Sequence, residues 1–183
     1  GMGAEVWVLD RNVDVLRNLW RQYGNSINTQ YATRDAIEAH CQNADLVIGG
    51  VLVPGASAPK LLTRAMLKQM KAGSVVVDVA IDQGGCFETS HATTHDEPTY
   101  LVDGVIHYCV ANMPGAVPRT STFALNNATL PYALALADKG LDALRQDVHL
   151  RNGLNVFQGQ ITHAGVAESL GYAYADPLTV LNG

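Results

Sequence analysis

The stretches that decide the fold are ADLVIGGV, residues 44–51, and SVVVDVA, residues 74–80. Both are short, rich in β-branched residues and bounded by small residues, a pattern that predicts strands buried on both faces. Between them, Thr63 can cap a helix that runs through Met70 and closes at Gly73. A helix that connects two such strands is typical of a parallel sheet with helices packed on both faces.

The same alternation extends outward in both directions. Upstream, a strand at 4–10 precedes a helix that Asn12 can cap and that Gly24 can end. We therefore predict an α/β fold, a doubly wound, Rossmann-like parallel sheet followed by a helical C-terminal extension. The remaining predicted elements are a weak strand at 27–31, a helix at 34–43, strands at 99–102 and 105–110, a loop at 111–118, and helices at about 121–139, 141–149 and 163–170.

The composition limits the class of protein. Of the 183 residues, 48% are hydrophobic and 16% are charged, and the formal net charge is -5. These values predict a sizeable core and exclude wholesale disorder. We expect no nucleic-acid partner, because no basic face is visible, and no membrane span, because no apolar run reaches ~18 residues. The three scattered cysteines favour small buried residues over disulfides, as in a reduced, cytoplasmic protein.

Asp10 is the first candidate for chemistry, because it ends the first predicted strand. In a dinucleotide-binding sheet, an acid at the end of the second strand accepts hydrogen bonds from the adenosine ribose hydroxyls. Such an acid also repels a 2′-phosphate, so Asp10 favours NAD over NADP. An Asp that ends a strand is also commonly a turn or helix cap, and this alternative stays open.

The glycine loop that should precede Asp10 is missing. A Rossmann unit needs about 30 residues for its first strand, glycine loop and helix, but only nine residues precede Asp10. We therefore expect the sheet to lack its first strand and glycine loop. That strand lies in the middle of the usual order, so its loss leaves residues 5–9 and 46–51 unpaired. We hypothesise that rearrangement closes the gap, or that another copy fills it by strand exchange.

Glycine pairs follow both central strands, at 49–50 and at 84–85, where they come just after Asp82. Ligands of open α/β sheets bind beyond the carboxyl ends of the strands, so we expect Asp82 to point into the cofactor crevice. Close packing or tight turning explains the glycines equally well. His91 and His95 have helical metal-ligand spacing, but the threonines between them disfavour a helix, and we predict no metal site.

Longer motifs cover nearly the whole chain: LVPGA at 52–56, APK at 58–60, VDVAIDQGGCFE at 77–88, YCVANMP at 108–114, VPRTST at 117–122 and NATLPY at 127–132. Together they resemble L-alanine dehydrogenase and are far more specific than a lone glycine pattern. The related transhydrogenase α-subunits have a strand-end loop similar to Glu-Gln-Gly-Gly-Asn. The sequence IDQGGC at 81–86 favours alanine dehydrogenase.

The resemblance implies oxidative deamination of L-alanine to pyruvate and ammonia, with hydride transfer to NAD, in a homo-oligomer. It implies that Asp82 is catalytic and orients water and protons at the reacting carbon. The cofactor contacts that it implies are Asp10 on the adenosine ribose, Val51 and Leu52 along the adenosine half, Val79 near the nicotinamide ribose, and Val110, Asn112 and Met113 around the nicotinamide and substrate.

The resemblance also implies two parts. Residues 3–118 match a truncated NAD-binding domain, and residues 119–183 match the connecting helix and the C-terminal part of the substrate domain. Relatives begin with a substrate domain that binds the substrate carboxylate, a role to which we assign no residue here. We therefore expect the isolated chain to be inactive. The alternatives are a non-catalytic truncated remnant that folds and self-associates, and a transhydrogenase α-subunit-like protein.

Overall fold

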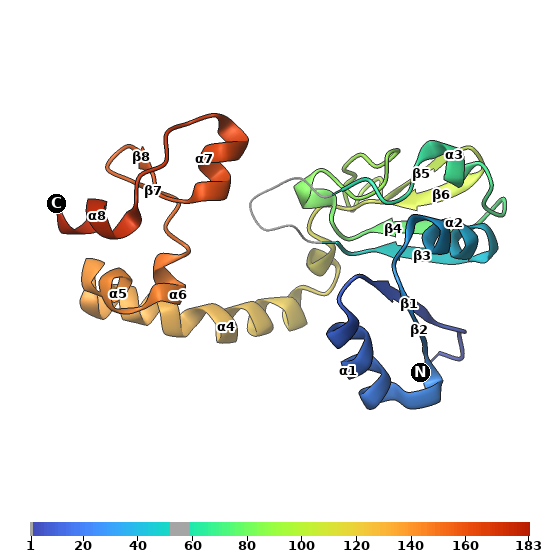
Figure 1. Ribbon diagram of the computed structural model, residues 1–183, viewed down its shortest axis with the longest axis horizontal. Coiled ribbons are helices and arrows are strands. Elements are labelled where there is room, and N and C mark those ends of the chain that lie inside the picture. Colours follow the sequence, from blue (N-terminus) through green and yellow to red (C-terminus); the bar gives the residue numbers. More distant parts are fainter. Residues whose placement is uncertain (1, 52–58) are drawn as a thin grey trace. The chain divides into compact units, whose positions relative to one another are not determined.

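The computed structural model describes residues 2–51 and 59–183, which divide into two compact units. The first unit ends at Ala111 and the second runs from Asn112 to Gly183 (Figure 1). The elements of the first unit are β1 (Trp7–Asp10), α1 (Val13–Tyr23), η1 (Gly24–Ser26), β2 (Asn28–Tyr31), α2 (Arg34–Asn43), β3 (Leu46–Gly49), α3 (Arg64–Leu67), β4 (Val75–Asp78), η2 (Ile81–Gln83), β5 (Thr99–Val102) and β6 (Val105–Tyr108).

Local signals set the ends of the first helices, as the sequence predicts. The Asn12 side chain accepts hydrogen bonds from the Asp14 and Val15 N–H groups at 2.9 and 3.3 Å and so caps α1. Gly24 ends that helix with a φ of +54°, which a glycine adopts at little cost. Helix α2 occupies the predicted range 34–43, and β1 pairs with β2 in parallel.

The main sheet contains four strands in the order β3-β4-β6-β5. Strands β3, β4 and β6 are parallel, and β5 joins the edge of the sheet as the antiparallel partner of β6. The register sets Gly49 beside Asp78, so the carboxyl ends of β3 and β4 are neighbours. This mostly parallel sheet with intervening helices confirms the α/β class.

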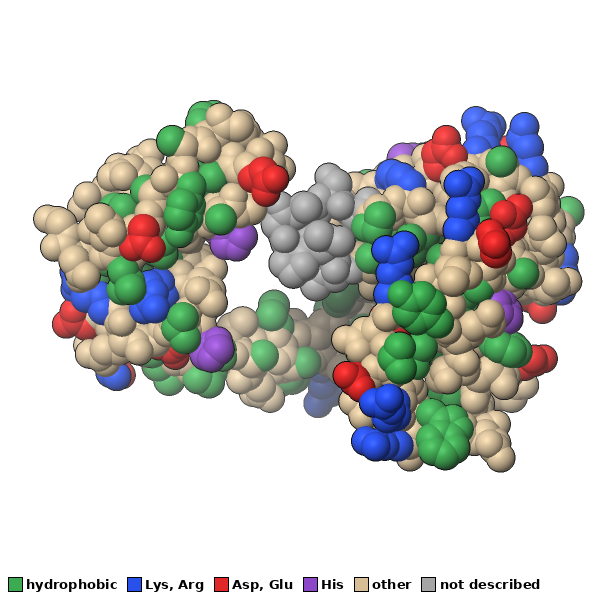
Figure 2. Space-filling model, in the orientation of Figure 1, with side chains coloured by type: hydrophobic (Ala, Val, Ile, Leu, Met, Phe, Trp, Pro, Cys, Tyr) green, Lys and Arg blue, Asp and Glu red, His purple; other side chains and the backbone are tan. Residues whose placement is uncertain are grey.

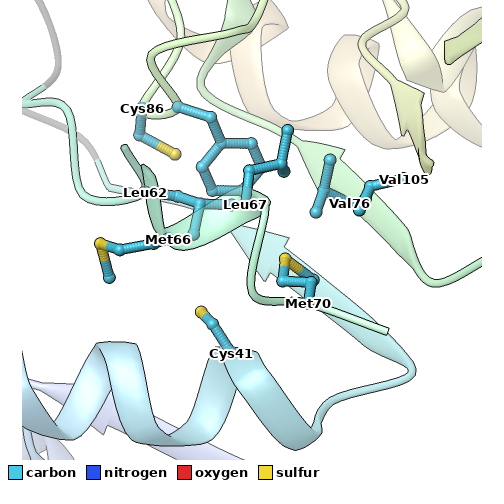
Figure 3. Close-up of a cluster of buried hydrophobic side chains, with 9 residues drawn as sticks. Cys41, Leu62, Met66, Leu67, Met70, Val76, Cys86 and Val105 are labelled. Atoms are coloured by element: carbon cyan, nitrogen blue, oxygen red, sulfur yellow. The ribbon is translucent and has the colours of Figure 1, made fainter. Parts of the chain in front are cut away.

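One face of the main sheet packs on α2 and α3. Met66 and Leu67 of α3 meet Cys41 of α2 above Val76 of β4 and Val105 of β6 (Figure 3). Each of these side chains is almost completely withdrawn from water, and burial of a large apolar side chain contributes roughly 1.5–3 kcal/mol. All three cysteines of the chain are buried and free, which confirms their interpretation as small buried residues.

The prediction that the central strands are buried on both faces is wrong for β3. Leu46 and Ile48 are 54% and 64% exposed, while Val47, on the other face, packs against the core. Residues alternate between faces along a strand, so the exposed pair shares the face opposite to the one that α2 and α3 cover. The sequence shows that this face is apolar, but its burial depends on another segment that would pack against it.

Strands β1 and β3 each pair on one side. β1 pairs with β2, and β3 pairs with β4, and the two groups form separate sheets in the described part of the unit. Helix α2 contacts both groups. The His40 side chain bonds to Gln30 of β2 at 2.7 Å and its ring lies against Trp7 of β1 in a tilted arrangement, while Cys41 enters the main core. β1 and β3 therefore belong to one unit without pairing with each other.

The second unit is mostly helical. Helix α4 starts three residues before its predicted range, with Pro118 in the first turn, where its missing N–H costs nothing. The single helix predicted at 141–149 is wrong, because Asp147 interrupts it and caps a new one through the His149 and Leu150 N–H groups. The elements of the second unit are η3 (Met113–Ala116), α4 (Pro118–Lys139), α5 (Leu141–Gln146), α6 (Val148–Arg151), β7 (Val156–Phe157), β8 (Gln160–Ile161), α7 (Ala164–Leu170) and α8 (Pro177–Asn182).

None of the helices within residues 2–51 and 59–183 combines the length and apolarity that a membrane span requires.

Candidate functional site

The candidate site begins where β3 and β4 end side by side. The Val79 N–H donates to the Gly49 carbonyl at 2.8 Å and so extends the ladder by one residue. Val51, two residues beyond β3, and Val79, one residue beyond β4, thus follow neighbouring strand ends, as the parallel pairing predicts. Val79 is 53% exposed and offers an apolar wall to a ligand at this edge.

Asp82 lies in the 3₁₀ turn η2 directly after β4, and its side chain is exposed. The turn is closed by hydrogen bonds from the Gln83 N–H to the Ala80 carbonyl and from the Gly84 N–H to the Ile81 carbonyl, at 2.9 and 3.0 Å. Asp82 makes no hydrogen bond with any residue that the structure describes. Its carboxylate is therefore available for chemistry.

Asp78, four residues earlier, has the opposite environment. It is completely buried, and its carboxylate accepts hydrogen bonds from the Cys86 and Phe87 N–H groups at 2.9 and 3.2 Å, from the Ala80 N–H at 3.1 Å and from the Ser90 hydroxyl. A buried charge needs such donors, because the water it has lost would otherwise cost several kcal/mol. Asp78 thus anchors both ends of the Asp82 loop to β4, a role that sequence reasoning missed.

The two glycines of the loop allow this arrangement. Gly85 has a φ of +72°, and a Cβ there would lie 2.7 Å from Asp78 Oδ2. A side chain would therefore collide with the buried carboxylate. Gly84 is also left-handed, with a φ of +82°, and ends η2. The tight-turn interpretation of this pair is confirmed.

The glycines after β3 differ from each other. A Cβ on Gly49 would lie 2.3 Å from Cys86 Sγ and 2.6 Å from Phe87 Cζ, so close packing requires this glycine. A Cβ on Gly50 would meet no atom within 4 Å among the described residues. No described residue fills the space beside Gly50, at the edge where the sequence predicts a ligand.

Cys86 is close to the site but is not a nucleophile. Burial and the neighbouring Asp78 carboxylate raise the pKa of the Cys86 thiol to about 12. A thiol with so high a pKa has almost no thiolate near neutral pH, and the thiolate is the reactive form. Cys86 therefore serves packing, with its Sγ 3.4 Å from Asp78 Oδ1.

Asp10 ends β1, and its Oδ1 accepts the Asn12 N–H at 2.7 Å. The turn-cap interpretation is thus correct for one carboxylate oxygen, while Oδ2 has no donor among the described residues. Both interpretations of Asp10 remain compatible, since each uses a different oxygen.

The other predicted cofactor residues belong to both units. Val110 is completely buried and bridges to Thr93, so its side chain has no surface to offer in this structure. Asn112 has a left-handed backbone with a φ of +64°, and Met113 starts η3; both belong to the second unit. Leu52 lies outside the described residues. Over residues 2–51 and 59–183, no cluster of His, Cys, Asp and Glu side chains could hold a metal ion.

An aromatic stack that sequence reasoning missed supports the far end of the loop. The His91 and Tyr100 rings stack with centroids 3.7 Å apart, and Tyr100 stacks on His107 at 4.8 Å. The buried His107 bonds to the Thr89 hydroxyl at 2.8 Å, and the Tyr100 hydroxyl donates to the Thr89 carbonyl at 3.0 Å. The stack fixes residues 89–91, the segment that contains Ser90, a donor to Asp78.

An α/β unit with an exposed acid beyond the end of a central parallel strand is typical of the class of proteins that bind ligands at the carboxyl edge of an open sheet. Residues 1–164 match the family model described as "Alanine dehydrogenase/PNT, C-terminal domain". This chain belongs to that family.

Individual relatives agree with the family match. The chain is 59% identical to the alanine dehydrogenase of Halomonas elongata over 99% of its own length and 49% of that protein's. It is 54% identical to alanine dehydrogenase 2 of Staphylococcus aureus, over 95% of this chain and 47% of that protein. The chain thus spans about half the length of the curated relatives that it matches.

Solved structures give the same result for the fold. A structure titled L-alanine dehydrogenase matches 92% of this chain and 47% of its own chain, with a TM-score of 0.82 and 50% identity. A transhydrogenase from Sinorhizobium meliloti matches 66% of this chain and 42% of its own, with a TM-score of 0.53 and 26% identity. The likeness is greater to the alanine dehydrogenase, in agreement with the interpretation of the IDQGGC loop.

Proposed function

We propose that this chain forms part of an NAD-dependent alanine dehydrogenase, which oxidatively deaminates L-alanine to pyruvate and ammonia. The observation that carries the proposal is the exposed Asp82 on a fixed turn beyond β4, in a chain 59% identical to an alanine dehydrogenase. In the reaction, NAD supplies the hydride acceptor when bound.

Three features of the strand ends fit a nicotinamide dinucleotide. The space beside Gly50 is not filled by any described residue, and the exposed Val79 can form an apolar wall. Gln83 Oε1 is buried and has no hydrogen-bond partner among the described residues, so a ligand that brings an N–H donor would satisfy it. Asp10, Val51 and Leu52 would hold the adenosine half, and Val79, Asn112 and Met113 would contact the nicotinamide half. The side chain of Val110 is buried, so Val110 would contribute through its backbone alone.

Asp82 would act on protons at the reacting carbon. Its carboxylate has no internal partner among the described residues, so it can accept a hydrogen bond from water or from the substrate amine. The turn that carries it is tied to β4 through Asp78, which limits the directions in which Asp82 can point. A carboxylate fixed in this way could orient a water molecule, because its oxygens make no hydrogen bond or ion pair with a described residue.

The substrate carboxylate would be bound elsewhere. Relatives are about twice as long as this chain, and none of its own residues is assigned that role. We therefore propose that residues 3–118 supply the nucleotide-binding part, that 119–183 supply the connecting helix and part of the substrate domain, and that the isolated chain does not turn over alanine. A parallel strand from elsewhere, including an exchanged one in a homo-oligomer, would fit between β1 and β3, each of which has one side without a strand partner in the described part of the chain.

Isothermal titration of NAD and NADH into the purified chain tests the cofactor proposal. We expect Asp10→Ala to weaken binding by at least about tenfold, because it removes a charged acceptor of hydrogen bonds. Asp35→Ala is the control for loss of an acid of the first unit, since Asp35 is exposed, lies in the first turn of α2 and is not placed in the cofactor site. Equal affinity in both variants would remove Asp10 from the site. Absence of heat at millimolar nucleotide would favour a non-catalytic protein.

A further inference from the structure

Lys60 lies directly against the loop that carries Asp82. Its Nζ donates hydrogen bonds to the Gly84 carbonyl at 2.6 Å and to the Gly85 carbonyl at 2.8 Å. The left-handed backbone of both glycines brings two successive carbonyl oxygens to one ammonium group. An ammonium has three donors and a full charge, so it can satisfy both oxygens at once.

The backbone of Lys60 is held in place beside the loop by its neighbours. The Leu61 N–H donates to the Cys86 carbonyl at 2.7 Å, and the Glu88 N–H donates to the Leu62 carbonyl at 2.9 Å. Leu62 and Phe87 also form a parallel β-bridge. The segment after Lys60 thus runs alongside the segment after Gly85. This backbone pairing places the Lys60 side chain beside the loop.

Lys60 and Asp78 bind different parts of the loop. Asp78 holds the Cys86 and Phe87 N–H groups from inside. The Gln83, Gly84 and Gly85 N–H groups instead bond within the turn, to the Ala80 and Ile81 carbonyls at 2.9 to 3.0 Å. The part of the turn that contains Asp82 is therefore tied to a distant segment through its carbonyls, by Lys60.

We propose that Lys60 is a positioning residue whose positive charge holds residues 81–85 and thereby sets the direction of the Asp82 carboxylate. The chemical role of Asp82 rests on the proposed function, whereas the hold on the loop does not. Removal of the charge, by substitution or by acylation of the amine, loosens the turn and leaves the Asp78 anchor intact.

A chemically matched pair of side chains separates charge from bulk. The three native thiols are buried, whereas Lys60 is exposed. The thiol of a Lys60→Cys variant should therefore be alkylated selectively. Alkylation with 2-bromoethylamine restores an ammonium on a chain of nearly the original length, whereas iodoacetamide adds a neutral group of similar size. Lys68→Met is the control for loss of a surface charge, because Lys68 is exposed and makes no side-chain hydrogen bond with a described residue.

Amide hydrogen exchange, resolved by NMR, gives the readout. We expect the amides of residues 83–85 to exchange about tenfold faster in Lys60→Met and in the iodoacetamide adduct, the factor that one charge-assisted hydrogen bond contributes near a surface. The aminoethylated protein and Lys68→Met should retain parental rates. The amides of Cys86 and Phe87, held by Asp78, should stay protected in every variant.

Two results would overturn the inference: unchanged exchange at 83–85 in Lys60→Met, or an equal acceleration at Cys86 and Phe87, which would make Lys60 a general stabiliser. NADH titration of the same proteins distinguishes this failure from failure of the proposed function. Loss of protection at 83–85 in a chain that binds no NADH supports the hold by Lys60 and refutes the cofactor proposal. Unchanged protection in a chain that binds NADH refutes the hold by Lys60 and supports the cofactor proposal.

Discussion

Replacing Asp78 by asparagine tests how the loop beyond β4 is held. Asp78 is completely buried, and no lysine or arginine pairs with it among the described residues. Its Oδ1 accepts the Ala80 N–H at 3.1 Å, and its Oδ2 accepts the Cys86 N–H at 2.9 Å, the Phe87 N–H at 3.2 Å and the Ser90 hydroxyl. Backbone donors thus take the place of a cation.

The expected loss follows from these contacts. Asparagine keeps one acceptor oxygen and replaces the other by an amide that only donates. If that amide faces Ala80, an N–H group loses its partner, at a cost of about 1–3 kcal/mol. The bonds kept at the other oxygen become neutral and weaken by roughly 0.5–1.5 kcal/mol each, while relief from burying a charge offsets part of the loss. We expect Asp78→Asn to lower the free energy of unfolding by about 2–4 kcal/mol.

Urea unfolding followed by circular dichroism measures this free energy. Ser90→Ala is the matched control, because it removes one donor to Asp78 and leaves the charge and the backbone bonds in place. The control should lose about 1 kcal/mol. If Asp78→Asn unfolds within about 0.5 kcal/mol of the parent protein, the carboxylate is not the anchor of the loop and the reasoning is refuted.

Two further predictions concern the same sheet. Gly49→Ala should lower the free energy of unfolding by about 1–3 kcal/mol, because the new Cβ would collide with Cys86 Sγ. Gly50→Ala meets no atom of the described residues and should be neutral, and equal urea midpoints would contradict this. Burial lowers the pKa of His107 below its ordinary value of 6.5, so the folded state binds fewer protons than the unfolded state, and stability falls as the pH drops below 6.5. His107→Leu should lose less stability on acidification to about pH 5, measured by urea unfolding, and parallel pH profiles would count against it.

Elements whose ends depend on neighbouring residues could be predicted from the sequence. The cap at Asn12, the glycine at Gly24 and the helix at 34–43 are decided within a few positions of the chain, and all three predictions are confirmed. Asp147 shows the limit of periodicity, because its side chain caps a new helix inside a continuous apolar pattern. The hydrophobic periodicity on its own predicts one continuous helix, but the N-cap at Asp147 ends it and starts another.

Features that depend on distant segments could not be predicted. Leu46 and Ile48 belong to an apolar stretch, and the sequence gives no sign that one face of it would be left uncovered. Lys60 lies 24 residues before the carbonyl of Gly84 that it binds, and Asp78 lies inside a strand whose pattern shows only that it is apolar. By contrast, the position of Asp82 beyond the end of β4 could be predicted, because parallel strands bring their carboxyl ends to one edge.

The two acids of the VDVAID segment show how a fold separates structure from chemistry. Asp78 and Asp82 are four residues apart, and the strand-end rule selects Asp82 but gives no role to Asp78. Strand β4 turns Asp78 into the core, where N–H groups and a hydroxyl use both of its oxygens. The turn η2 exposes Asp82, which has no internal donor among the described residues. A carboxylate can exchange protons with a ligand only where its oxygens are not already used, so Asp78 fixes the loop, and Asp82 is the acid on which the proposed role in proton transfer rests.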